Sequence, residues 1–208
     1  MTAPTYPLTL PTAPAFTTAK WSLDRRVGVS QSPFTGAQQV YEFDYALWNA
    51  TLKLPPMRRA QAANWEAFLM KLHGQKGTFL LGNPDSSTAR GGISGSVTLG
   101  SNAAVGDFTI TLATSQNSLV NIFRAGDYIQ LGSGATAKLH IIVDDANSDG
   151  SGNVDVNVEP AIKTAVSSSA SVVYSNPKGV FRMQTSELGW DTDEVSTYGI
   201  SFACQEAI

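Results

Sequence analysis

Apolar and polar residues alternate along most of this chain, which is the pattern of half-buried β-strands. The clearest stretch places Tyr41, Phe43 and Tyr45 on one face and Glu42 on the other. Aromatic and β-branched residues favour strands, and similar alternation covers most of 20–54. The first part of the chain is therefore predicted to be mainly β.

The apolar period changes after Pro56. Apolar residues now recur at the i, i+3, i+7, i+10 spacing of one helical face, at Ala62, Trp65, Leu69 and Leu72. Gly74 follows them and suits the left-handed position that ends a helix. The spacing predicts a helix over about 57–73 whose aromatic stripe packs in a core.

The composition shifts again at 86–92, which is rich in Ser and Gly and resembles a linker. Beyond it lie short strand candidates separated by turn residues, which indicate a small sandwich or barrel. The candidates are 95–99, 108–113, 128–131, 138–143, 154–158 and 171–174.

The alternating pattern of the first region resumes near the C-terminus. We therefore expect a discontinuous β-sandwich domain made of 1–92 and 177–208, with one flanking helix. A small β-barrel-like module, 93–176, is expected to be inserted at a loop, where both of its ends can lie close together.

Composition narrows the classes of partner. Only 15% of the 208 residues are charged and the net charge is −3, so no clustered basic surface for nucleic acid is expected. No apolar run is long enough to cross a membrane, and the N-terminus lacks the pattern of a signal peptide. We expect a protein made in the cytoplasm, with Cys204 as a buried strand residue.

No catalytic constellation stands out, and we expect no enzyme and no cofactor. His73 and His140 lie outside any metal-ligand spacing, and no nucleophile or nucleotide-binding motif is present. The segment 145–150 matches the start of a calcium loop, but Val156 stands where a bidentate Glu belongs. A turn is favoured over a calcium site, and no metal is expected.

The candidate functional residues are interface residues. The segment 1–14 contains four prolines and is either a loose tail or an arm that lies along a neighbouring subunit. Arginine is also favoured at subunit contacts. The candidates are Tyr6, Leu8, Leu10, Arg25, Arg26, Arg58 and Arg59.

Several short signatures together resemble one family. They are the strand 41–54 leading into Pro55-Pro56-Met57, the helix with Trp65-Glu66-Ala67-Phe68, the segments 74–84 and 123–131, and Phe181-Arg182 with Trp190. This layout resembles the distal tail proteins of long-tailed, siphovirus-like bacteriophages and of gene transfer agents.

The resemblance implies a tail-tube-like β-sandwich that assembles into a hexameric ring. Such a ring lies in the virion tail tip, or baseplate, and joins the tail tube protein to the tip hub. The insert would project outward and could hold tail fibres. The family is structural, so no catalytic residues are carried over.

Three alternatives stay open. The chain could be another tail component, such as a tube subunit or the hub, because those proteins share the plan of sandwich plus helix. It could be a carbohydrate-binding β module, which would stack sugars on exposed aromatic rings. An enzyme of a class that the motifs do not reveal is the third alternative.

Overall fold

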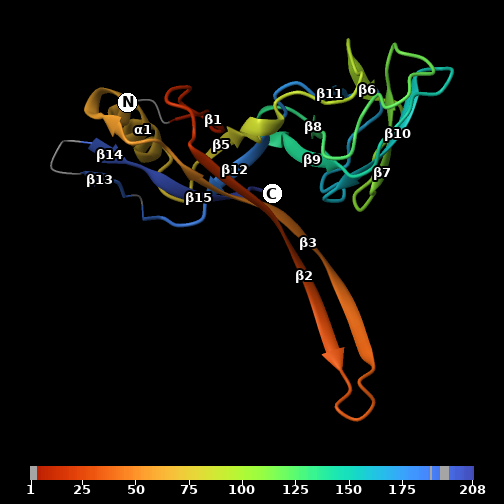
Figure 1. Cartoon of the computed structure of the whole chain (residues 1–208), viewed down its shortest axis with the longest axis horizontal. Coiled ribbons are helices and arrows are strands. Elements are labelled where there is room, and N and C mark those ends of the chain that lie inside the picture. The colour runs from red at the N-terminus through yellow and green to blue at the C-terminus, as the bar shows by residue number, and fades with distance from the viewer. Residues whose placement is uncertain (1–3, 188, 193–196) are drawn as a thin grey trace.

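The structure is a computed structural model that describes residues 4–187, 189–192 and 197–208. These residues form two sheets, a closed barrel and one α-helix, which confirms the predicted, mainly β fold class. Figure 1 shows the helix and the smaller sheet at one end of the molecule and the barrel at the other. A long hairpin projects away from both ends.

The larger sheet has six strands in the order β1-β5-β12-β15-β3-β2. Neighbouring strands are antiparallel, apart from β1 and β5, which run parallel. Its strands are β1 (Leu8–Thr9), β2 (Thr18–Gln31), β3 (Gln38–Lys53), β5 (Thr78–Leu81), β12 (Gly179–Met183) and β15 (Ser201–Glu206).

The helix α1 (Arg59–Lys71) packs against the larger sheet. The rings of Trp65 and Phe202 lie 6.2 Å apart, and those of Phe68 and Phe79 lie 5.7 Å apart. Ala62, Trp65, Leu69 and Leu72 are all buried, as the helical spacing predicts. A smaller sheet has the strands β13 (Asp191–Thr192), β14 (Thr197–Gly199) and β4 (Met57–Arg58).

The helix is two residues shorter at each end than the predicted 57–73. Met57 and Arg58 instead form β4, because Met57 pairs with Tyr198 of β14. At the other end, Gly74 has a φ of +67°, the left-handed conformation expected just beyond a helix.

The proline-rich N-terminal segment is docked on its own chain over 4–14. Its strand β1 pairs with β5, and the hydroxyl of Tyr6 donates to the carbonyl of Lys71 at 2.8 Å. The indole of Trp65 donates to the carbonyl of Ala13 at 3.2 Å. The loose tail expected as one alternative is therefore wrong, since this segment covers part of the core.

The barrel closes in the order β10-β7-β6-β11-β8-β9. Every strand lies within two residues of its predicted bounds, because alternation also governs this region. The strands are β6 (Val97–Leu99), β7 (Thr109–Ala113), β8 (Tyr128–Leu131), β9 (Lys138–Ile142), β10 (Asn153–Glu159) and β11 (Ser171–Val173). Two 3₁₀ turns, η1 (Pro84–Ser86) and η2 (Gly134–Thr136), complete the elements.

The chain enters and leaves the barrel side by side. A bridge joins Thr88 to Ser175, and the amide of Asn176 donates to the carbonyl of Ser87 at 2.5 Å. Inside the barrel, alternate residues of β10 face a separate apolar core. In the described part of the chain, no helix is both long and apolar enough to span a membrane.

Candidate functional site

The strands β2 and β3 continue far beyond the sheet that contains their inner ends. β15 pairs with β3 only from Asn49 to Lys53, whereas β2 follows β3 to the turn, where Gln31 lies opposite Gln38. The outer part is thus a two-stranded ribbon, which Figure 1 shows extending away from the body. We call residues 27–43 the distal hairpin.

The distal hairpin exposes apolar side chains on both faces. Val29 lies opposite Val40 on one face, while Tyr41 and Phe43 lie on the other, with ring centroids 4.8 Å apart. In the turn, Phe34 is 95% exposed. The exposed apolar residues of this segment are Val27, Val29, Phe34, Val40, Tyr41 and Phe43.

Most of this segment carries no charge. Residues 27–41 include no Asp, Glu, Lys, Arg or His, although exposed ribbons usually rely on charges to prevent aggregation. A two-stranded hairpin is marginally stable in water by itself. An exposed, uncharged and apolar hairpin is therefore typical of a surface that another protein covers.

Two arginines at the base of the hairpin make contacts within the chain. The guanidinium of Arg25 forms ion pairs with Glu42, at 3.0 Å, and with Glu159 at the end of β10. The guanidinium of Arg26 lies 4.9 Å from the ring centroid of Tyr45. The predicted interface pair Arg25 and Arg26 thus makes contacts within the chain.

A groove of about 560 Å³ lies between the base of the hairpin and the barrel. Its charged lining residues, Arg25, Glu42 and Lys163, all take part in ion pairs within the chain. Its lining also includes four exposed apolar side chains: Phe43, Val105, Phe108 and Ile208.

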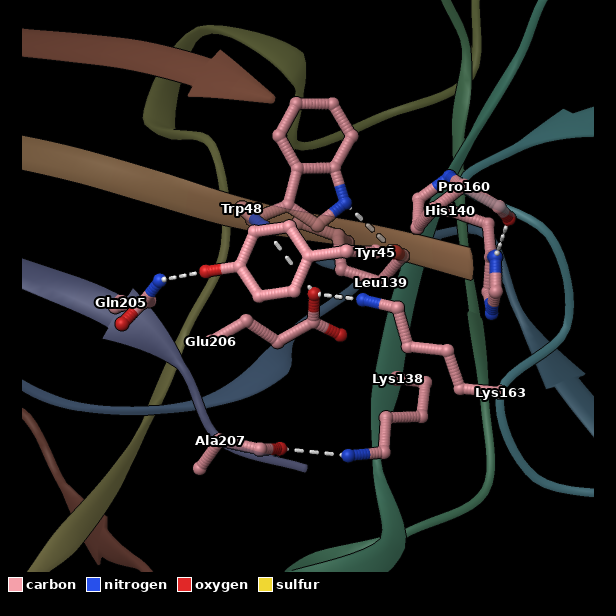
Figure 2. Close-up of polar contacts among 10 residues, drawn as sticks. All are labelled: Tyr45, Trp48, Lys138, Leu139, His140, Pro160, Lys163, Gln205, Glu206 and Ala207. Atoms are coloured by element: carbon pink, nitrogen blue, oxygen red, sulfur yellow. Dashed lines mark hydrogen bonds and ion pairs between the residues drawn. The ribbon is translucent and has the colours of Figure 1, made fainter. Parts of the chain in front are cut away.

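Figure 2 shows the junction of the barrel with the larger sheet. The indole of Trp48 donates to the carbonyl of Leu139 at 2.9 Å. One carboxylate oxygen of Glu206 accepts from the amide of Trp48 at 3.3 Å and pairs with the ammonium of Lys163. The ammonium of Lys138 donates to the carbonyl of Ala207 at 2.6 Å.

This junction is buried. The side chains of Glu206 and Lys163 are 0% and 13% exposed. Tyr128 and Leu139 of the barrel belong to the same apolar cluster as α1 and the larger sheet. The barrel is therefore packed against the sheet through both apolar and charged contacts.

Burial shifts the pKa values of the basic side chains at the junction. It lowers the pKa of Lys163 and of Lys138, and the carboxylate of Glu206 partly opposes both effects. Burial likewise lowers the pKa of His140 to about 4, despite its hydrogen bond with the Pro160 carbonyl, which is 2.8 Å away. His140 is consequently neutral near pH 7, with Nδ1 as the donor, and it fixes the loop that follows β10.

The suspected calcium segment forms hydrogen-bonded turns. Asp149 accepts from the amides of Ser151 and Asn153, each at 2.8 Å, and these bonds lower its pKa. Asp145 accepts from the amide of Ala125 at 2.9 Å. Across the described residues, no group of three or more His, Cys, Asp or Glu side chains is placed to hold a metal.

The remaining predicted interface residues fall into two groups. Leu8 and Leu10, like Tyr6, are partly buried against the main core. Arg58 and Arg59 are exposed where the helix begins. The structure brings neither group to the distal hairpin, and their role at an interface stays a prediction.

Sequence reasoning missed the distal hairpin as a surface. The alternation correctly predicts strands there, but it does not say whether a face is covered. The useful signal was the lack of charge over residues 27–41, on both sides of the turn residues Pro33 and Gly36. The pair of Lys163 and Glu206 was also missed, because its partners lie far apart in the sequence.

No family model matches the chain, and no curated protein is significantly similar to it in sequence.

Proposed function

We propose that this protein is a structural subunit of a phage tail tip, a distal tail protein whose ring joins the tail tube to the tip hub. The observation that carries the proposal is the distal hairpin. It exposes apolar side chains on both faces and carries no charge over residues 27–41.

The hairpin favours assembly with other protein chains. Apolar patches of this kind mark contact surfaces, and the centre of an interface is depleted in charged residues. Association would bury the side chains of Val29, Phe34 and Val40, which the monomer leaves in water. The contact surface is a hydrogen-bonded extension of the larger sheet.

Other features suit the same role. Charged residues make up only 15% of the chain, as expected where neighbours cover much of the surface. The barrel lies beside the sheet and away from the turn of the hairpin, so it could hold fibres or other tail parts (Figure 1). The six-fold symmetry and the place in the virion rest on the family resemblance.

Electron microscopy of the purified protein in negative stain tests this function. We expect closed six-fold rings from the full chain, and single particles from a variant with Val29→Ser, Phe34→Ser and Val40→Ser. Val120→Ser changes an exposed apolar residue of the barrel and should leave the rings intact.

Other images would contradict the proposal. Long stacked tubes would indicate a tube subunit, and a compact trimer would indicate a hub. Single particles from the full chain at every concentration would rule out a ring that forms without other tail proteins.

A further inference from the structure

We propose that the groove between the hairpin base and the barrel receives the hairpin turn of the next copy of this chain, with Phe34 as the side chain that fills it. This inference rests on the proposed function, because it names the contact through which the ring subunits would join.

The groove has the volume of a ligand pocket and a lining that is largely apolar. Its volume of about 560 Å³ lies within the range of about 300–1,000 Å³ that is typical of ligand pockets. Phe43, Val105 and Phe108 are exposed along it, which gathers apolar surface from the hairpin and from the barrel at one place. A contiguous apolar surface of this kind is the usual mark of a binding site.

The turn of the same chain cannot occupy this groove. Phe43 lies at the groove, and β3 begins at Gln38, closer to the turn. Five strand residues extend about 17 Å at about 3.3 Å per residue, and the turn lies beyond them. Because the strands stay paired as far as Gln31 and Gln38, the turn lies far from the groove of its own chain, and a turn that enters the groove comes from another copy.

The turn and the groove match in charge. The turn has no charged residue, and every charged residue that lines the groove is already in an ion pair within the chain. Docking would therefore leave no charged side chain of the groove buried without a partner, which would otherwise oppose binding. A charged peptide or an anionic ligand would find no complementary charge here.

The turn is ordered before it binds. The amide of Gly36 donates to the carbonyl of Ser32, and the amide of Ser32 donates to the carbonyl of Ala37, both at 2.9 Å. Pro33 fixes the backbone next to Phe34. A preordered turn loses little conformational entropy on docking, and a protruding aromatic ring is a typical anchor residue.

The contact is heterologous, because the turn and the groove are different patches of one chain. Each copy would give one turn and accept one, which generates a ring when the rotation closes. A symmetric dimer would instead place the same patch of both copies together.

Disulfide trapping between two variants, each with one introduced cysteine, tests the contact. One pool carries Phe34→Cys and the other carries Val105→Cys, and both are oxidised separately and then as a mixture. Burial raises the pKa of native Cys204 to about 12, so this thiol should stay unreactive. We expect a covalent dimer of the two variants only in the mixture.

A matched control replaces Val105→Cys with Val120→Cys, which is also exposed on the barrel but does not line the groove. This pair should give no covalent dimer above background. A covalent dimer between the Phe34→Cys and Val120→Cys variants would overturn the groove contact. The same holds if Phe34→Cys forms dimers with itself in preference to the mixed dimer. If rings are seen by microscopy but no mixed dimer forms, the groove contact fails while the proposed function stands.

A charge placed in the groove provides a second test. Phe108→Glu should abolish the ring while leaving the melting temperature of the monomer close to that of the native chain. Val120→Glu should leave the ring unchanged. Rings that persist in folded Phe108→Glu would overturn the contact.

Discussion

The inner and outer halves of the β2–β3 hairpin share one alternating sequence pattern and differ in what covers them. In the inner half, Trp48, Ala50 and Leu52 are buried within the main core. In the outer half, Val29 and Val40 face water. Alternation thus predicts the strand in both halves, while burial depends on neighbours that come from elsewhere in the chain or from another chain.

The two halves should respond differently to substitution. The inner half stabilises the monomer, because its side chains fill a packed core. The outer half contributes little to the monomer and should matter only when copies assemble. The following predictions run from the largest expected change in monomer stability to the smallest.

Trp48→Ala should lower the free energy of unfolding by about 3–5 kcal/mol, because it removes a large buried side chain and leaves a cavity. It also leaves the carbonyl of Leu139 without its indole donor. Chemical denaturation measures the loss. Phe34→Ala is the control in the outer half, and an equal loss there would refute the contrast between the halves.

Glu206→Gln should destabilise the monomer by up to about 3–5 kcal/mol, because the buried ammonium of Lys163 loses its counter-charge. The matched control is Glu42→Gln, which removes an exposed partner of Arg25 and should cost no more than about 1 kcal/mol. The two losses are compared by denaturant titration at pH 7. If Glu42→Gln proves the costlier change, the junction is not the buried contact described above.

Stability should fall as the pH drops from 6.5 toward 4. Burial lowers the pKa of His140 from 6.5 to about 4, so the unfolded chain takes up a proton in this window that the folded chain does not. Since each pKa unit corresponds to about 1.4 kcal/mol, the loss should reach about 3 kcal/mol near pH 4. The contribution is fully present above pH 6.5.

Unfolding titrations at a series of pH values measure this effect. In His140→Gln, the free energy of unfolding should depend less on pH between pH 6.5 and 5, where few carboxylates titrate. An unchanged slope in His140→Gln would exclude His140 as the cause.

Deleting residues 1–14 should lower the free energy of unfolding by about 1–3 kcal/mol, since the buried indole of Trp65 loses its acceptor at Ala13. Thermal unfolding of the truncated chain measures this change. The expected loss in the free energy of unfolding is thus smaller than for the inner half of the hairpin and larger than for the outer half. Unchanged stability would mean that the segment does not cover the core in solution.

The triple substitution Val29→Ser, Phe34→Ser and Val40→Ser should change the stability of the monomer by less than about 0.5 kcal/mol per site, as is usual for exposed positions. Denaturation below the concentration at which copies associate measures it. A larger loss would place these side chains in the core of the monomer.

Much of the fold follows from the sequence because local patterns decide it. The barrel strands, the helix and its buried stripe all come from apolar spacing, and Cys204 is buried in β15 as expected. The N-terminal segment could not be placed, since its pairing with β5 depends on contacts with residues far along the chain. The same holds for the pairing of Glu206 with Lys163.

The central claim is that copies of this chain cover the distal hairpin. Light scattering over a dilution series measures the mass of the full chain and of the Val29→Ser, Phe34→Ser and Val40→Ser variant. The account predicts a closed oligomer that dissociates on dilution for the full chain, and a folded monomer throughout for the variant. Equal masses for the two proteins at every concentration would contradict it.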